Sequence, residues 1–144
     1  MNISQNGLFL IKQFESFSSR PYTCPAGKLT IGFGHVILPG ESFTEITLDT
    51  ALELLRADCA IAENTINKAV KPILNQNKFD ALTSFTFNVG CENFLESTLL
   101  KLINLQDYQS AANQFPRWIY ANGVALDGLI NRRNLERELF LKAN

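Results

Sequence analysis

At 144 residues, the chain is long enough for one domain, or for two small lobes that share a core. With 46% hydrophobic and 19% charged residues it has the composition of a globular protein, which excludes intrinsic disorder. The net charge of −1 excludes the basic surface typical of nucleic-acid-binding proteins. The sequence contains no apolar run of about 18 residues, so no membrane-spanning helix is predicted.

The N-terminal sequence lacks the basic head, uninterrupted apolar stretch and small-residue cleavage site of a secretory signal. We therefore expect the chain to start in the cytoplasm of the cell that makes it. The three cysteines, Cys24, Cys59 and Cys91, are odd in number, widely spaced and in no metal-ligand pattern. Free thiols are expected, with no metal and no cofactor.

Residues 4–15 are predicted to form an amphipathic helix. Its apolar stripe includes Leu8 and Ile11, and Glu15 projects between them on the helical wheel. A carboxylate in that position is partly shielded from water, and desolvation raises the pKa of an acid, as a general acid near neutral pH requires. The alternative is that Glu15 only ends the helix and points into solvent.

Residues 18–40 are rich in proline and glycine, and they surround one predicted strand, KLTIGFGHV, at 28–36. One face of this strand is apolar, and the other carries the hydroxyl of Thr30 beside two glycines. Glycine inside a strand is typical of a close approach by a ligand or another backbone. The alternative is a glycine-rich hairpin without a ligand. The apolar face of the strand carries Leu29, Ile31, Phe33 and His35.

His35 is the only histidine, and a structural role with a buried carboxylate partner is expected for it. The longest periodic segment runs from Thr47 to Val70, with apolar residues at alternating steps of three and four. If it is helical throughout, it spans roughly 36 Å, which is long enough to connect two lobes. Asp58 lies beside its apolar stripe and is a candidate partner for His35.

After Pro72 only short helices are predicted, and no linker or internal repeat divides the chain. In the last helix Arg132 shares a face with leucines, so it is predicted to be semi-buried and to require a carboxylate partner. Arg133 and Arg137 are predicted to form a solvated face with Glu136 and Glu138. The predicted short helices fall near 77–88, 94–104, 107–114, 116–121 and 130–141.

A series of short motifs extends over nearly the whole chain. They are FE at 14–15, Y-x-C-x-A-G at 22–27, TIGFGH at 30–35, LLRAD at 54–58, FNVG at 87–90, F-x-x-STLL at 94–100, Trp118, and GL-x-x-RR-x-x-E at 128–136. In this order they resemble the lysozyme-type endolysins of tailed bacteriophages. TIGFGH with a glutamate upstream at this distance is the specific part of the resemblance, and the RR-x-x-E block supports it.

The resemblance implies a lysozyme-like α+β fold in a single catalytic domain. A small N-terminal lobe with a β-hairpin, at about 16–50, would be joined by a long helix, at about 47–70, to a helical lobe at about 71–144. The helix at 4–15 would pack with the helical lobe, and a cleft would lie between the lobes. The implied reaction is hydrolysis of the β-1,4 bond between N-acetylmuramic acid and N-acetylglucosamine, which lyses the host cell.

Three residues are implied to be catalytic. Glu15 would protonate the leaving glycosidic oxygen, and Thr30 would position the attacking water on the opposite face of the sugar. Cys24 occupies a position where the best-known members carry aspartate. We expect its neutral thiol to help Thr30 place the water, which predicts inversion of configuration. A thiolate base or charge stabiliser, a nucleophile that forms a thioglycosyl adduct, and a redox partner of Cys59 or Cys91 are the alternatives.

The resemblance also implies supporting and binding residues. His35 would pair with Asp58, and Arg132 would reach Glu15. The implied partner is bacterial peptidoglycan, which a monomer would reach through a holin or after membrane damage, without inserting into the membrane or binding nucleic acid. Phe87, Asn88 and Ser97 match positions that line the saccharide cleft.

Two other functions fit the same motifs. A lytic transglycosylase uses one acid and no water nucleophile, and the missing aspartate at position 24 is compatible with that mechanism. The retained Thr30 favours hydrolysis. A non-catalytic wall-binding or tail module on the same fold is the other alternative, and it is disfavoured because Glu15, Thr30 and the TIGFGH motif are intact.

Overall fold

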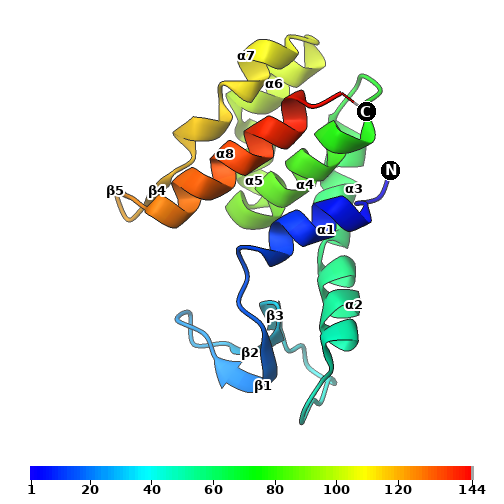
Figure 1. The fold of residues 1–144 in the computed structure, drawn as a ribbon, viewed down its shortest axis with the longest axis vertical. Helices are drawn as coiled ribbons and strands as arrows, with labels where there is room; N and C mark the ends of the chain where they lie inside the picture. Colours follow the sequence, from blue (N-terminus) through cyan, green and yellow to red (C-terminus); the bar gives the residue numbers. More distant parts are fainter. Residues whose placement is uncertain (144) are drawn as a thin grey trace.

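In the computed structural model, which describes residues 1–143, a small lobe of strands lies below a larger lobe of helices (Figure 1). Helices α2 and α3 run along one side and connect the two lobes. The small lobe contains β1 (Ser18–Thr23), β2 (Leu29–Gly32) and β3 (His35–Val36). The connecting segment contains α2 (Leu48–Asp58) and α3 (Ala60–Ala69). The predicted α+β architecture, with an N-terminal hairpin and a helical lobe, is confirmed.

The helical lobe is built around α4, which packs against both α1 and α8 (Figure 1). Its core is dominated by fully buried aromatic rings, as the phenylalanine content of this segment indicates. These rings belong to Phe79, Phe85, Phe94, Phe115 and Phe140. The elements of this lobe are α1 (Gln5–Lys12), α4 (Gln76–Val89), α5 (Cys91–Glu96), α6 (Thr98–Asn104), α7 (Tyr108–Ala112), η1 (Phe115–Arg117), β4 (Tyr120–Ala121), β5 (Val124–Ala125) and α8 (Asp127–Leu141).

Helix α1 ends earlier than predicted. Its N-terminus is capped by the side chain of Ser4, and its apolar stripe buries Leu8 and Ile11. The helix ends at Lys12. After it the backbone forms turn-type hydrogen bonds, from the Phe14 amide to Ile11 and from the Glu15 amide to Lys12. Glu15 therefore lies on the segment that leaves the helix, and not on the helix itself.

The predicted strand at 28–36 is in fact two strands. β2 and β3 pair antiparallel, with Ile31 opposite His35, and a turn at Phe33 and Gly34 lies between them. Gly32 and Gly34 have φ angles of +69° and +83°, which residues with a Cβ rarely adopt, and they reverse the chain there. Leu29, predicted to lie on the apolar face, is 51% exposed.

The predicted continuous helix from Thr47 to Val70 is interrupted at one residue. α2 and α3 meet at Cys59, whose ψ of −16° departs from regular helical geometry. Backbone hydrogen bonds nevertheless cross the break, from the Cys59 amide to Leu55 and from the Glu63 amide to Cys59. The two helices consequently act as one connection between the lobes (Figure 1).

Two predictions for the helical lobe are wrong. The helix expected at 94–104 is divided at Ser97, which caps α6. The helix expected at 116–121 is replaced by η1 and by β4, which pairs with β5 as a hairpin. Asn122 and Gly123, with φ angles of 51° and 79°, form its turn, and this Asn-Gly pair is a strong hairpin signal.

Candidate active site

Glu15 lies in a partly dry position between the two lobes. Its side chain is 26% exposed, and Arg132 Nη1 of α8 lies 3.4 Å from its Oε1. On the other side, a Cβ on Gly34 would come within 3.4 Å of its Oε2, so the β2–β3 turn closes against the carboxylate. Burial raises the pKa of Glu15 above its ordinary value, and the attraction of Arg132 offsets part of this effect.

Cys24 and Thr30 meet at the turn end of the β1–β2 hairpin. Thr30 is buried, and its hydroxyl donates to the carbonyl of Lys28 at 3.0 Å. Cys24 is partly exposed, and its pKa lies below the usual value because the Lys28 backbone and then the Thr30 hydroxyl stabilise the thiolate. The structure therefore brings these two side chains together on the three-stranded sheet whose β2–β3 turn places Gly34 against Glu15.

His35 is buried between two carboxylates. Its Nδ1 lies 2.8 Å from Asp58, and its Nε2 lies 2.9 Å from Glu41, which the sequence analysis did not identify. Burial alone would lower the pKa of His35, but hydrogen bonds to Glu41 and Asp58 raise it above 6.5. Only the protonated ring can donate to both carboxylates at once. Glu41 lies in a loop without periodicity, so no sequence signal indicated it.

This arrangement predicts how stability depends on pH. Because the pKa of His35 is raised on folding, its stabilising contribution is complete below the unfolded value of 6.5 and is lost as the pH rises through the folded pKa. Urea unfolding at about pH 5.5 and about pH 8 measures the effect, and the lower pH is expected to give the larger unfolding free energy. In His35→Gln the difference should shrink. An unchanged difference would assign it to other groups.

Arg132 belongs to a buried ionic network on α8. Its Nε lies 3.2 Å from Glu136, and Arg133 Nε lies 2.8 Å from the same carboxylate. Ser84 of α4 donates to Glu136 at 2.6 Å. The predicted solvated face is wrong for Arg133 and Glu136, which are both fully buried where α4 covers this side of α8, whereas Glu138 is exposed.

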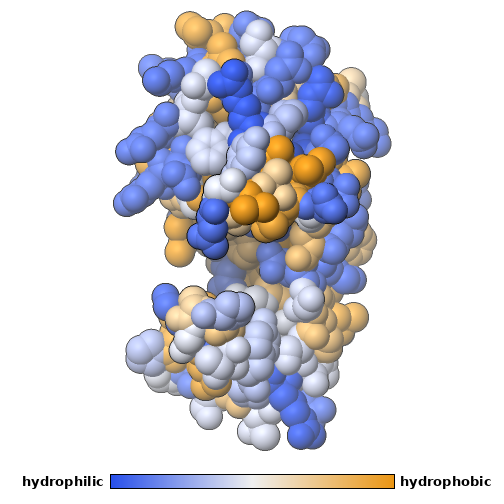
Figure 2. Space-filling model, turned by 90° about the vertical axis from the view of Figure 1, so that its left-hand side faces the viewer, coloured by the Kyte–Doolittle hydropathy of each residue, from blue (hydrophilic) through white to orange (hydrophobic). Residues whose placement is uncertain are grey.

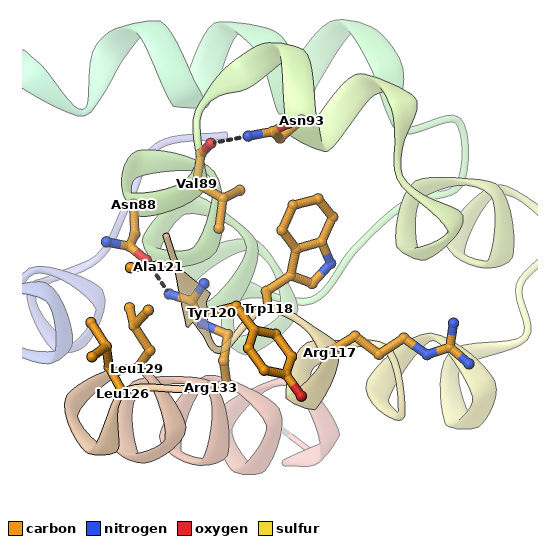
Figure 3. Close-up of a pocket in the computed structure, with 10 residues that line it drawn as sticks. All are labelled: Asn88, Val89, Asn93, Arg117, Trp118, Tyr120, Ala121, Leu126, Leu129 and Arg133. Carbon is orange, nitrogen blue, oxygen red and sulfur yellow. Dashed lines mark hydrogen bonds between the residues drawn. The ribbon is translucent and has the colours of Figure 1, made fainter. Parts of the chain in front are cut away.

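Two adjoining cavities extend from Glu15 along the N-terminal half of α8. One, of about 390 Å³, is lined by Glu15 and Arg132, and the other, of about 510 Å³, by Trp118 and Tyr120. In the larger one Arg133 bonds the amide oxygen of Asn88 at 2.6 Å (Figure 3). Figure 2 shows this side of the molecule hollowed between the two lobes. Both cavities share Asn88, Leu126 and Leu129.

The other two predicted saccharide-binding residues lie elsewhere. Phe87 packs against the core cluster formed by α1, α2 and the hairpin turn. Ser97 is buried at the start of α6, where its hydroxyl donates to Phe94 and accepts from Leu100. Neither lines the two cavities that contain Asn88. The aromatic lining of the larger cavity comes from Trp118 and from Tyr120 on β4, in the segment at 116–121 that was predicted to be helical.

The three cysteines are free thiols. Cys59 is buried between the helices, and burial raises its pKa to about 12. Within residues 1–143, no group of three histidine, cysteine or acidic side chains is arranged to hold a metal ion. In the same part of the chain, no helix combines the length and apolar character needed to cross a bilayer.

Comparison with known proteins identifies the family. The sequence matches the family described as phage lysozyme over residues 12–136. It is 40% identical to the endolysin of Acyrthosiphon pisum secondary endosymbiont phage 1, over 99% of this chain and 100% of that protein. The fold matches a mutant of P22 lysozyme with a TM-score of 0.91, at 38% identity, over 99% of both chains. It also matches the muramidase domain of SpmX from Asticaccaulis excentricus with a TM-score of 0.89, at 36% identity, again over 99% of both chains. The predicted lysozyme-like fold is thus confirmed, and the chain belongs to the phage lysozyme family.

Proposed function

We propose that this protein is an endolysin that hydrolyses the β-1,4 bond between N-acetylmuramic acid and N-acetylglucosamine in peptidoglycan. The observation that carries the proposal is the partly buried carboxyl of Glu15, which pairs with Arg132 at one end of the two adjoining cavities. The solved relatives described as a lysozyme and as a muramidase domain support the same chemistry.

Glu15 acts as the general acid. Because burial raises its pKa, the carboxyl retains its proton at higher pH than an exposed glutamate and can donate it to the leaving glycosidic oxygen. Arg132 then stabilises the carboxylate that remains. The Gly34 turn borders the other carboxyl oxygen and leaves room for it, because glycine has no side chain there.

Thr30 orients the attacking water. While the Cys24 thiol is neutral, the Thr30 hydroxyl gives its proton to the Lys28 carbonyl, so its oxygen is left to accept a hydrogen bond. A water that donates to Thr30 directs its lone pair away from this oxygen and toward the sugar. Cys24, beside Thr30, supplies a second acceptor. Addition of water opposite the leaving group inverts the anomeric configuration.

The larger cavity binds the polymer next to the scissile bond. Trp118 and Tyr120 present aromatic surface, and the Asn88 amide supplies polar contacts (Figure 3). Arg133 lines the same cavity, and its Nη2 donates to the Asn88 amide oxygen and so orients this amide.

The experiment that tests the function identifies the new ends of the fragments. Purified peptidoglycan is digested and the products are separated by mass, with an enzyme-free digest as the control. Reducing muramic acid ends are expected, and ¹H NMR of the first products should give the inverted anomer. Reducing glucosamine ends would reject the proposed bond. Anhydro-muramic acid ends would show that the enzyme is a lytic transglycosylase and not a hydrolase.

Cys24→Ser separates the possible roles of the thiol. We expect kcat to stay within about fivefold of the wild type, because one hydrogen-bonding group replaces another. Initial rates on purified peptidoglycan measure this. A loss of about a hundredfold or more would instead assign a nucleophilic or basic thiolate to Cys24. The matched control is Cys91→Ser, which changes a partly exposed thiol on α5.

We also propose that the enzyme reaches the wall from the host cytoplasm once the membrane is permeabilised. The endolysin relative that matches over 99% of this chain supports a lytic role at the wall. Cells that express the protein are expected to lyse only after a holin is induced or chloroform is added. Lysis without either treatment, measured by culture turbidity, would show that the enzyme exports itself.

A further inference from the structure

The ionic network behind Glu15 contains more charge than a simple acid–arginine pair. Arg132 and Arg133 are both buried, and the carboxylate of Glu136 lies between them at 3.2 Å and 2.8 Å. Ser84 of α4 donates to this carboxylate at 2.6 Å. Burial raises the pKa of Glu136, and the two guanidiniums and the Ser84 hydroxyl oppose this effect by stabilising the carboxylate.

Arg132 connects this network to the acid. Its Nε faces Glu136 at 3.2 Å, and its Nη1 faces Glu15 at 3.4 Å. Its remaining nitrogen donates to the Ser84 carbonyl at 3.1 Å, which fixes the plane of the guanidinium. One arginine is therefore shared between two carboxylates, one from α8 and one from the segment after α1.

The other surroundings of Glu15 are neutral. The hairpin presents Gly34, and α4 presents Asn88, whose amide oxygen is held by Arg133 at 2.6 Å. Among the described residues, Arg132 is the ionised side chain that contacts Glu15. The balance of charge behind Arg132 thus determines the field that Glu15 experiences.

We propose that Glu136 and Arg133 are positioning residues which, through Arg132, set how strongly Glu15 holds its proton. The inference rests on the proposed role of Glu15 as the acid. Glu136 cancels one of the two buried positive charges, so Arg132 can anchor Glu15 without driving it into the ionised form. This gives the Arg133–Glu136 pair a role in supporting the Arg132–Glu15 pair.

Two substitutions should act in opposite directions. Glu136→Gln leaves two uncompensated guanidiniums, which favour ionised Glu15 and lower its pKa. Arg133→Gln leaves an excess of negative charge, which disfavours ionised Glu15 and raises its pKa. At the separations in this network, each shift is expected to be about one pH unit. A purely structural role would not give shifts of opposite sign.

The experiment is a ¹³C NMR titration of the Glu15 carboxyl in protein labelled at glutamate, with Glu15→Gln used to assign the signal. The pH profile of kcat/KM on peptidoglycan is measured in parallel, and its upper limb should move with the NMR value. The matched control is Glu138→Gln, an exposed glutamate on the same helix, which should leave the Glu15 titration unchanged. Thermal unfolding establishes that each variant is folded.

The possible results decide the inference. Opposite shifts, with a near-normal titration in the double variant Glu136→Gln/Arg133→Gln, support it. An unchanged Glu15 titration in a folded variant, or shifts of the same sign, overturn it. If Glu136→Gln does not fold, the upward shift in Arg133→Gln alone is the test. The NMR titration needs no turnover, so a wild type that fails to cleave peptidoglycan would reject the proposed function while this inference is still tested.

Discussion

Glu15→Gln is expected to lower kcat on purified peptidoglycan by about 100- to 10,000-fold, because the amide cannot give a proton to the leaving oxygen. In the wild type, kcat/KM should fall as the pH rises through the raised pKa of Glu15, since only the protonated carboxyl is active. That upper limb of the pH profile should be absent from any residual activity of the variant. Initial rates of release of reducing ends, measured from acidic to basic pH, give both quantities.

The variant should remain folded. Replacing a partly buried carboxyl with an amide of the same shape removes the cost of desolvating a charge, and the hydrogen bond from Arg132 can still be accepted. Its melting temperature should therefore match or exceed that of the wild type. The matched control, Glu96→Gln, alters an exposed glutamate on α5 and should keep full activity. Substantial activity in folded Glu15→Gln would remove Glu15 from the acid role.

Phe85→Ala is expected to lower the free energy of unfolding by about 3–5 kcal/mol. The ring is fully buried on α4 and meets Phe115 and Trp118 edge to face, with centroids 5.4 Å and 5.6 Å away. Arg133 also lies over this ring, at 5.1 Å from its centroid. The cavity left by alanine would therefore lower stability and also release two side chains that line the larger cavity.

Urea unfolding measures the stability change, and the KM for peptidoglycan fragments measures the effect on binding. Phe85→Leu retains most of the volume and should lose much less stability. Phe9→Ala is the control for loss of an aromatic ring at the surface, since Phe9 is 43% exposed. Equal losses in Phe85→Ala and Phe9→Ala would contradict the packing account.

Much of the fold and part of the site could be predicted from the sequence. The periodic apolar pattern predicted the connecting helices, and the resemblance to phage endolysins implied an N-terminal hairpin, whereas the segment with TIGFGH was predicted as one strand and forms two. The end of α1 was misplaced because the apolar period continues to Phe14, although the helical hydrogen bonds have already stopped. Periodicity reports which faces are apolar, whereas backbone geometry decides where a helix ends.

The burial of Arg133 and Glu136 could not be predicted in the same way. A helical wheel describes one helix alone, and on α8 these residues fall outside the leucine stripe. They are buried because α4 covers them, which is a property of the tertiary arrangement. Glu41 was missed for a related reason, since a loop residue gains its partner only when the loop folds back over His35.

Gly34 shows how this fold limits the substitutions that its sequence can accept. Its left-handed backbone closes the β2–β3 turn, and the space where a Cβ would stand borders the carboxylate of Glu15, the proposed acid. A side chain here would strain the turn and crowd the acid in one event. A substitution at Gly34 is therefore expected to lower both stability and activity. The absence of a Cβ allows the backbone conformation of the turn and also leaves space beside Glu15.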